Sequence, residues 1–534
     1  MNRRDFLAAS AALAASSCAA PGTPPLPPGE IVGADADFGH RLRDGRFPPP
    51  TATWRHAVLV VGGGIAGLSA AWKLDKGGVD DFLVCELESR VGGNARWGEN
   101  SASAYPWGAH YLPLPTRDCR AVRELLAELG VLQGDPQAAR PSYEERYLSA
   151  SPQERLFRDG VWQEGMMPQS RLSSSEQAQA KRFADLMQQM KTKRGRDGRK
   201  AFALPLEFSS RDPALLALDR GSMRDWLLAQ GFDSAPLHWY VDYACRDDFG
   251  TRAAATSAWA GIHYFACRDG EAANAGSDIV LTAPEGNGWI VRRLEERLRP
   301  RLQTGALCLA IRDEGRRAVA DVYLRGEDRT VRIEAEQLIW AAPVFLLPKV
   351  WSEAPPGLLD AARRVDYAPW LVANLTLARL PEERRGAPLS WDNVLYGNDS
   401  LGYVVATQQT LRTRPGPTVF TYYRALCDGT SAQARRQLLE TPREAWAESI
   451  LAELEIVHPD LRELTARIDV CRFGHAMARP HPGALWHGLR QRLAQPHGRI
   501  HLAHADLSSM SVFEEANYRG VVAAERVLER LGVS

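Results

Sequence analysis

The glycines Gly62, Gly63, Gly64 and Gly67 stand where a protein could bind a diphosphate. They follow the apolar run 57–61 directly and precede a stretch of small residues. The apolar run is typical of a buried parallel strand, and the small residues are typical of a helix packed closely on it. We expect Gly62 to allow a tight turn, Gly64 to admit a pyrophosphate, and Gly67 to let the helix approach the strand. The helix N-terminus would then direct free N–H groups toward the phosphates.

An acidic residue follows the next predicted strand. The run 81–85 is apolar after its first residue and ends at Glu86, 24 positions after Gly62. A carboxylate at this place can accept hydrogen bonds from the ribose hydroxyls of an adenine dinucleotide. It would repel a 2′-phosphate, so the pattern disfavours NADP.

The segment after Glu86 separates FAD from NAD. It contains Arg90-Val91-Gly92-Gly93-Asn94, and here the chain resembles the flavin-containing amine oxidase superfamily, which includes protoporphyrinogen oxidases and phytoene desaturases. In that family an Arg-x-Gly-Gly-Arg-like loop wraps the pyrophosphate of FAD; Asn94 takes the place of the frequent final arginine. The resemblance therefore implies FAD as cofactor, with Arg90, Gly92, Gly93 and Asn94 as contacts.

Three later segments continue the resemblance. The stretch 106–111 is similar to the family's small-residue segment under the flavin ring, which implies contacts from Gly108 and Ala109. The predicted hairpin 306–324 corresponds to one that touches adenine through its backbone, at Cys308. The C-terminal strand 499–506 ends at Asp506, which in the family bonds the ribityl or pyrophosphate region. His504 and Ala505 stand where alanine and glycine are usual.

The order of these segments predicts an α/β protein. Its glutathione-reductase-like, Rossmann-like FAD-binding domain is interleaved with an α+β substrate domain. We assign residues 53–115, 281–345 and 476–534 to the FAD-binding domain, and residues 116–280 and 346–475 to the substrate domain. At 534 residues the chain is long enough for two such domains.

Two histidines are the candidate catalytic residues. His110 follows the small-residue segment, and His475 precedes the last predicted strand. Histidine can move protons near neutral pH, although both could equally be hydrogen-bonded structural residues. Amine oxidases of the family often carry a lysine near the flavin, but the corresponding stretch 367–374 has none, and Lys349 lies in a different element.

Three functions are compatible with the sequence. The first is oxidation of an amine, such as a polyamine, by hydride transfer to flavin, with oxygen or a quinone-type molecule as electron acceptor. The second is desaturation or dehydrogenation of an apolar or cyclic small molecule. The third is a non-enzymatic flavin-binding envelope protein. An acidic entrance would favour the first, an apolar tunnel the second, and a closed flavin site without a cavity the third.

Composition excludes other classes of protein. Lys+Arg and Asp+Glu are both 65, so nothing calls for a nucleic-acid partner. The eight cysteines are scattered without Cys-x-x-Cys pairs, and His501 and His504 would face opposite sides of a strand. We therefore expect no metal site.

The N-terminus predicts export. Arg3-Arg4-Asp5-Phe6-Leu7 is a twin-arginine pattern followed by a short alanine-rich run. We assign residues 1–20 to this signal and residues 21–52 to a Pro-rich linker. The protein would then be periplasmic or envelope-anchored. Residues 15–18 loosely resemble a lipoprotein cleavage site, so the alternatives are membrane attachment through Cys18 and plain cleavage nearby.

Overall fold

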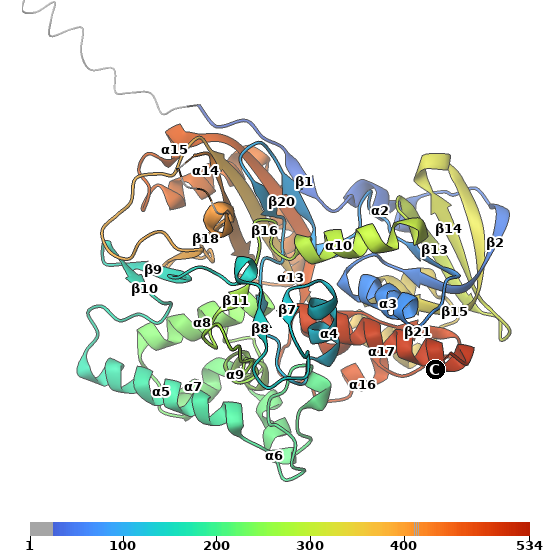
Figure 1. Cartoon of the computed structure of the whole chain (residues 1–534), viewed down its shortest axis with the longest axis horizontal. Helices are drawn as coiled ribbons and strands as arrows, with labels where there is room; N and C mark the ends of the chain where they lie inside the picture. The colour runs from blue at the N-terminus through green and yellow to red at the C-terminus, as the bar shows by residue number, and fades with distance from the viewer. Residues whose placement is uncertain (1–24, 411, 413, 415, 534) are drawn as a thin grey trace, which may run out of the picture.

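The computed structural model describes residues 25–410, 412, 414 and 416–533. The predicted signal at residues 1–20, with its arginine pair and Cys18, lies outside this range. Two β-sheets lie side by side with helices packed around them (Figure 1). Among the described residues, none of the helices combines the length and the apolar character that a membrane span requires.

The first sheet has seven strands, in the order β12-β3-β2-β15-β14-β13, with β21 also paired to β15. The pairs among β12, β3, β2, β15 and β21 are parallel, whereas β13 and β14 form an antiparallel hairpin beside β15. Residues 58–61 are buried because helices or strands cover both faces of the sheet. This sheet confirms the Rossmann-like α/β fold class that the sequence predicts. Its strands are β2 (Pro50–Val61), β3 (Phe82–Cys85), β12 (Leu302–Gln303), β13 (Ala306–Asp313), β14 (Ala318–Leu324), β15 (Arg329–Trp340) and β21 (Ile500–Leu502).

Helices pack on the faces of this sheet. The C-terminal helix lies against the first helix after β2 (Figure 1), and the two approach so closely that a Cβ on Gly520 would lie 2.1 Å from the Ala66 carbonyl oxygen. One face carries α3 (Ile65–Lys76), α4 (Arg120–Glu128), α10 (Gly288–Leu298) and α17 (Phe513–Leu531). The other carries α11 (Leu347–Val350), α12 (Pro356–Arg363) and α16 (Leu489–Leu493).

The second sheet has eight strands, in the order β1-β20-β16-β19-β18-β17-β9-β10. One face packs on α13 (Ser431–Glu440), α14 (Arg443–Leu454) and α15 (Leu461–Leu464). The opposite face is apolar too, and it turns toward α8 (Ala235–Phe249). The strands are β1 (Ile31–Gly33), β9 (Glu154–Arg158), β10 (Val161–Glu164), β16 (Tyr367–Leu377), β17 (Asp392–Leu395), β18 (Tyr403–Val405), β19 (Thr418–Ala425) and β20 (Thr465–Ala478).

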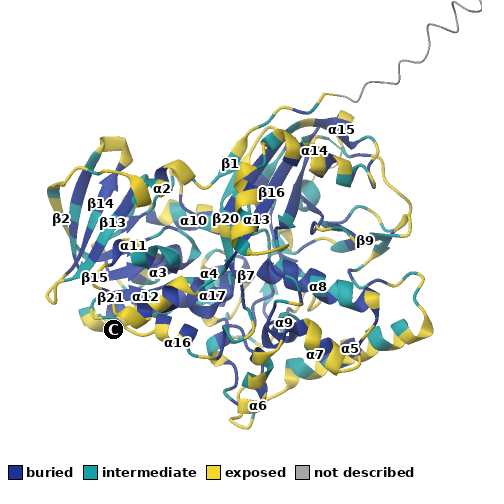
Figure 2. Cartoon of the chain, turned by 180° about the vertical axis from the view of Figure 1, so that it is seen from behind, coloured by how far each residue is buried: buried dark blue, intermediate teal, exposed yellow. Residues whose placement is uncertain are grey.

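A layer of helices closes the lower side of the molecule in Figure 1. It comprises α5 (Ser174–Thr192), α6 (Pro213–Leu216), α7 (Met223–Ala229), α8 and α9 (Ala258–Ala266). The helix α5 begins with a capping box between Ser173 and Glu176. It buries Phe183 and Met187 and exposes its outer side (Figure 2), so the helix is amphipathic.

Short elements complete the fold. Three two-stranded sheets are formed by β4 (Trp97–Glu99) with β5 (Ala104–Pro106), β6 (Leu112–Pro113) with β11 (Val280–Leu281), and β7 (Leu132–Gln133) with β8 (Ser142–Tyr143). The 3₁₀ turns are η1 (Gly93–Ala95), η2 (Glu145–Tyr147), η3 (Leu206–Phe208), η4 (Ala217–Arg220), η5 (Arg299–Arg301), η6 (Arg325–Glu327), η7 (Val344–Leu346), η8 (Ala406–Gln409) and η9 (Ala505–Ser508).

The structure differs from the predicted linker at residues 21–52. Within its described part, β1 adds a parallel edge strand to β20, and α2 (Ala36–Asp44) is capped by Asp35. Phe38 of α2 is buried against Tyr323 of β14. This segment therefore folds onto both sheets, because edge pairing and a buried aromatic ring stabilise it despite its prolines.

Candidate active site

A cavity of about 400 Å³ lies at the carboxyl ends of the parallel strands β2, β3, β15 and β21. Sheets of this kind bind nucleotide cofactors at this edge. We call it the cofactor cleft. Its lining includes Gly62, Gly64, Glu86, Gly93, Asn94, Arg96, Ala109, Cys308, Phe345, Tyr367, His475, His504 and Asp506.

The glycine loop leaves room for a diphosphate. Gly62 has φ +107°, which side chains rarely adopt, and a Cβ on Gly67 would lie 1.8 Å from the Gly62 carbonyl oxygen. Both positions therefore require glycine for the fold itself. Gly64 differs, because a Cβ there would have its nearest neighbour 3.9 Å away, at the Cα of Gly93. The free space at Gly64 lies in the cleft, at the N-terminus of α3.

Glu86 lines the cleft beside this loop. Its carboxylate accepts hydrogen bonds from the backbone N–H groups of Gly63 at 2.6 Å and Glu88 at 2.9 Å. Burial raises the pKa of Glu86, and the two backbone donors oppose that shift. Gly63 is not itself part of the cleft lining, and its contribution is the hydrogen bond that holds the Glu86 carboxylate in place.

The loop after Glu86 brings only some of its predicted residues to the cleft. Gly93 and Asn94 line it, and the Asn94 amide donates a hydrogen bond to the Ala476 carbonyl oxygen at 2.6 Å. Gly92 lies behind them with φ +125°. Arg90 is exposed and lies outside the cleft, with its guanidinium 4.8 Å from the centre of the Trp97 ring. Arg96 lines the cleft instead.

Asp506 is fully buried at the end of the cleft. Its Oδ2 accepts hydrogen bonds from the Tyr367 hydroxyl at 2.6 Å and from the Val344 N–H at 3.0 Å. Burial alone would raise its pKa, but His504, Tyr367 and Val344 together hold that pKa below the ordinary value. Its Oδ1 has no hydrogen-bond partner among the described residues, so this buried oxygen is available to a bound group.

These residues fit FAD. The space at Gly64 can take a pyrophosphate, Glu86 can accept from ribose hydroxyls, and the unpaired oxygen of Asp506 can accept from the cofactor further along the cleft. Ala306 and Cys308 of β13 also line this cleft. The family resemblance implies the adenine contact at Cys308.

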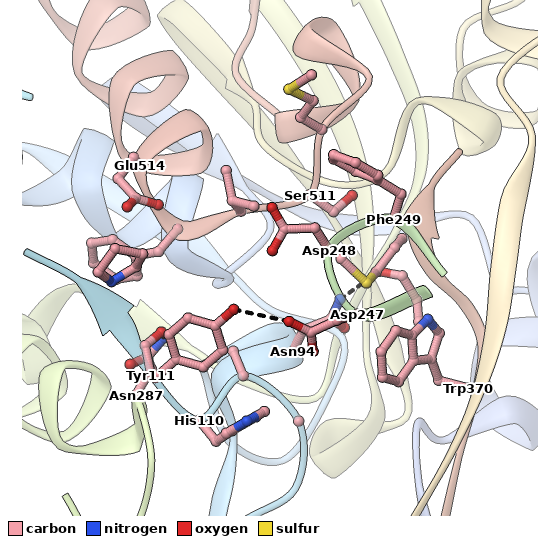
Figure 3. A pocket seen from close by; sticks show the side chains of 18 of the residues that line it. Asn94, His110, Tyr111, Asp247, Asp248, Phe249, Asn287, Trp370, Ser511 and Glu514 are labelled. Atoms are coloured by element: carbon pink, nitrogen blue, oxygen red, sulfur yellow. Dashed lines mark hydrogen bonds between the residues drawn. The ribbon is translucent and has the colours of Figure 1, made fainter. Parts of the chain in front are cut away.

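A smaller cavity of about 150 Å³ adjoins the cleft and shares part of its lining, including Asn94, Ala109, Phe473 and Ala476. We call it the inner cavity. Figure 3 shows Tyr111, Asp247, Asp248, Trp370 and Glu514 gathered around one space. Its lining also includes Gly108, His110, Phe249, His263, Arg268, Val372, Tyr423, Met477 and Met510.

Among the described residues, three carboxyl groups and a single arginine line the inner cavity. Arg268 forms an ion pair with Asp248 at 2.6 Å and donates to the Tyr111 hydroxyl at 3.1 Å. The Tyr111 hydroxyl in turn donates to Asp247 at 3.2 Å (Figure 3). Neither Asp247 nor Glu514 forms an ion pair within the described part of the chain. The cavity therefore has an excess of negative charge when its acids are ionised.

Burial controls the titration of these acids. It raises the pKa of Glu514 to about 7. It also raises the pKa of Asp247, with the charge of Asp248 acting in the same direction, and the pKa of Asp248, which Arg268 partly lowers again. Perturbed carboxyl groups beside a cofactor site are candidates for binding or proton transfer.

The two candidate histidines do not meet. His110 lines only the inner cavity, stacked on Tyr423 with 4.4 Å between ring centres. His475 lines only the cofactor cleft, stacked on Phe345 at 4.2 Å. Burial lowers the pKa of each to about 4. Both are therefore neutral at physiological pH and suited to packing or hydrogen bonding.

No lysine is part of the described lining of either cavity. In the stretch 367–374, Trp370 and Val372 line the inner cavity. Asn374 instead donates to the Pro106 carbonyl oxygen at 3.0 Å and accepts from Thr421. Lys349 is exposed on α11.

The local sequence hardly indicates that these acidic residues line a cavity. Asp247 and Asp248 come from the end of α8, Arg268 follows α9, and Glu514 lies in the first turn of α17. The adjacent acids 247–248, near the end of α8, are the one local signal that could have marked them.

The sequence profile of the family described as flavin containing amine oxidoreductase matches residues 65–528. No curated protein sequence matches the chain.

Several solved structures share the fold. A wild-type putrescine oxidase bound to putrescine is 17% identical with a TM-score of 0.65, and the alignment covers 90% of this chain and all of that one. Cyclohexylamine oxidase from Brevibacterium oxydans IH-35A is 16% identical with a TM-score of 0.64, covering 89% and 99%. The CLA-producing fatty acid isomerase from P. acnes is 14% identical with a TM-score of 0.59, covering 88% and 98%.

Proposed function

Since the chain belongs to the flavin-containing amine oxidoreductase family, we propose that it oxidises a cationic amine in the inner cavity. It is an FAD-dependent oxidoreductase. The observation that carries the proposal is the acidic lining of the cavity next to the cofactor cleft.

The acids of the inner cavity suit an ammonium group. Asp247 accepts a hydrogen bond from neutral Tyr111, whereas Arg268 neutralises Asp248. An ammonium group entering the cavity would supply the positive charge that Asp247 and Glu514 lack. Buried charges are stable chiefly when they are paired and hydrogen-bonded, so a cationic substrate is favoured over a neutral or anionic one.

The remaining lining positions the substrate and excludes water. His110, Tyr423, Trp370 and Phe473 form an aromatic wall around the acids. Bound FAD supplies the acceptor for the hydride that leaves the carbon next to nitrogen. Because burial raises the pKa of Asp247 and Glu514, either carboxylate can take the proton that the ammonium group must lose before its oxidation.

Dehydrogenation of a neutral apolar or cyclic substrate is the second candidate. Two observations favour it: much of the lining is apolar, with Phe249, Val372 and Met510 among its members, and the described lining lacks lysine. The acids argue against it, because a neutral substrate would supply no counter-ion to those that are ionised.

We further propose that the protein acts outside the cytoplasm. The support is the twin-arginine pattern at Arg3 and Arg4, with Cys18 as the point of membrane attachment if it is lipidated. Oxygen or a quinone-type molecule would then reoxidise the flavin. Cell fractionation of the wild type and of an R3K/R4K variant tests the export, since only the variant should remain cytoplasmic.

The substrate class is tested by anaerobic flavin reduction. The holoenzyme is mixed with a monoamine, a diamine and a ring amine, and with the neutral alcohol of the same carbon skeleton as each. We expect at least one amine, and none of the alcohols, to bleach the flavin absorbance. Reduction by a neutral cyclic compound but by no amine would favour dehydrogenation and overturn the proposal.

A further inference from the structure

A third cavity, of about 440 Å³, shares no lining residue with the cofactor cleft or the inner cavity. It lies where η3 and the residues after it meet α16 and α17. We call it the arginine cavity, after the residues Glu207, Arg211, Trp486, Arg490, Arg519 and Arg526 of its lining.

The charge of this cavity is strongly positive. Four arginines line it together with one glutamate. Glu207 accepts from Arg211 at 2.6 Å, but from Arg490 and Arg519 only at 3.4 Å and 3.3 Å. Glu515 lies behind the wall, where it accepts from the Leu206 N–H and the Ser508 hydroxyl. Even with Glu515 included, two positive charges remain unbalanced.

Two buried donors of the lining have no partner among the described residues. Arg490 is only 3% exposed, and its Nε makes no hydrogen bond. Trp486 is 8% exposed, and its Nε1 is likewise unpaired. A buried donor without an acceptor costs free energy, and each such group calls for an explanation. Both residues line the cavity, so an acceptor bound there is the group best placed to pair with them.

Three of the four arginines are held in place before any ligand arrives. The guanidinium groups of Arg211 and Arg490 lie 4.5 Å and 5.1 Å from the centre of the Trp486 ring. The Nε of Arg519 donates to the Ser508 hydroxyl at 2.9 Å. Stacking and hydrogen bonding of this kind reduce the side-chain entropy that binding would otherwise remove.

We propose that the arginine cavity binds a small oxyanion, a molecule that carries a phosphate group or several carboxylates. Planar guanidinium groups match these anions through paired charge-assisted hydrogen bonds. The cavity is large enough for a small organic anion and separate from the flavin site. The proposal is therefore independent of which substrate the enzyme oxidises.

Isothermal titration calorimetry of the holoenzyme tests the site, with inorganic phosphate and citrate as probes at constant ionic strength. We expect saturable binding of one probe per chain. Tighter binding of phosphate would indicate a phosphorylated ligand, and tighter binding of citrate a polycarboxylate. The R211Q/R526Q double variant changes the two more accessible arginines and should bind about tenfold or more weakly.

The matched control is R436Q, which removes an exposed arginine of α13 outside the cavity. It should bind like the wild type, and thermal melts should show that all variants are folded. Absence of saturable binding by either probe, or equal affinity in the double variant and the wild type, would overturn the proposal.

Discussion

The Tyr111 hydroxyl donates to the Asp247 carboxylate at 3.2 Å, while the neighbouring Asp248 is paired with Arg268 at 2.6 Å. Two consecutive acids of α8 therefore have different environments. Asp248 forms an ion pair with Arg268, whereas among the described residues Asp247 forms no ion pair and accepts its side-chain hydrogen bond from the neutral Tyr111 hydroxyl. This difference makes Asp247 the residue that we expect to bind the ammonium group of a substrate.

Replacing Asp247 with asparagine should weaken amine oxidation selectively. The amide keeps the size of the side chain but removes the charge, and loss of one partner of a buried pair costs about 2 kcal/mol or more. We expect kcat/KM for the best amine to fall roughly thirtyfold or more. Steady-state kinetics check this, with D360N as control because Asp360 is exposed on α12. Equal losses in both variants would argue against the assignment.

The titration of Glu514 should make stability depend on pH. Burial raises its folded-state pKa from 4.5 to about 7. The folded protein therefore keeps a proton that the unfolded chain releases above pH 4.5. The resulting stabilisation is present at low pH and is lost as pH rises through 7, by at most about 3 kcal/mol.

An E514Q variant removes this titration. Urea unfolding at several pH values gives the free energy of unfolding of both proteins. The value for E514Q minus the value for the wild type should increase between pH 5 and pH 8, because only the wild type loses stability there. A difference that does not change with pH would show that Glu514 is already ionised at pH 5.

Alanine at two glycines of the same loop should have opposite consequences. A Cβ at position 67 would lie 1.8 Å from a backbone oxygen, so G67A should destabilise the fold by about 3 kcal/mol or more. A Cβ at position 64 would have its nearest neighbour at an ordinary contact distance of 3.9 Å, and Gly64 has an ordinary φ of −74°. G64A should therefore fold normally but bind FAD weakly, because its methyl group occupies the cleft.

Thermal melts of the apoproteins and the ratio of flavin to protein absorbance separate these effects. If G64A retained full flavin content, the pyrophosphate would have to bind elsewhere in the cleft.

The parts of the site that local sequence encodes were predictable. Gly62, Gly64 and Glu86 follow strands whose apolar pattern is plain, and each lies where the turn geometry puts it. The acids of the inner cavity were not, because Asp247 and Glu514 are 267 positions apart in the sequence, and only the tertiary fold brings the end of α8 and the start of α17 to the same cavity. The edge strand β1 was missed for the same reason: Ile31 pairs with Val470, and nothing near Ile31 indicates that partner.

Arg96, and not Arg90, should bind the cofactor. Both follow the glycine loop, but Arg96 lines the cleft, and its Nε donates to the Gly93 carbonyl oxygen at 3.1 Å. Arg90 lies on Trp97 outside the cleft. R96Q should lower FAD affinity about tenfold, the effect of one lost charge-assisted contact. R90Q should leave the affinity unchanged, and flavin titration of the two apoproteins compares them directly. Weaker binding by R90Q alone would restore the assignment made from the sequence.

Asp506 should contribute to both stability and cofactor binding, whereas Tyr367 should contribute mainly to stability. The D506A variant would leave the Val344 N–H and the Tyr367 hydroxyl buried without their acceptor, at a cost of about 2–4 kcal/mol. It would also remove the unpaired Oδ1 of a residue that lines the cleft, so its flavin content should fall. Y367F removes one hydrogen bond and keeps the carboxylate, so it should cost only about 1 kcal/mol and retain FAD. Urea unfolding and flavin absorbance measure the two properties separately. A D506A protein with normal flavin content would limit Asp506 to a structural role, as the anchor of η7 and β16 at the end of the cleft.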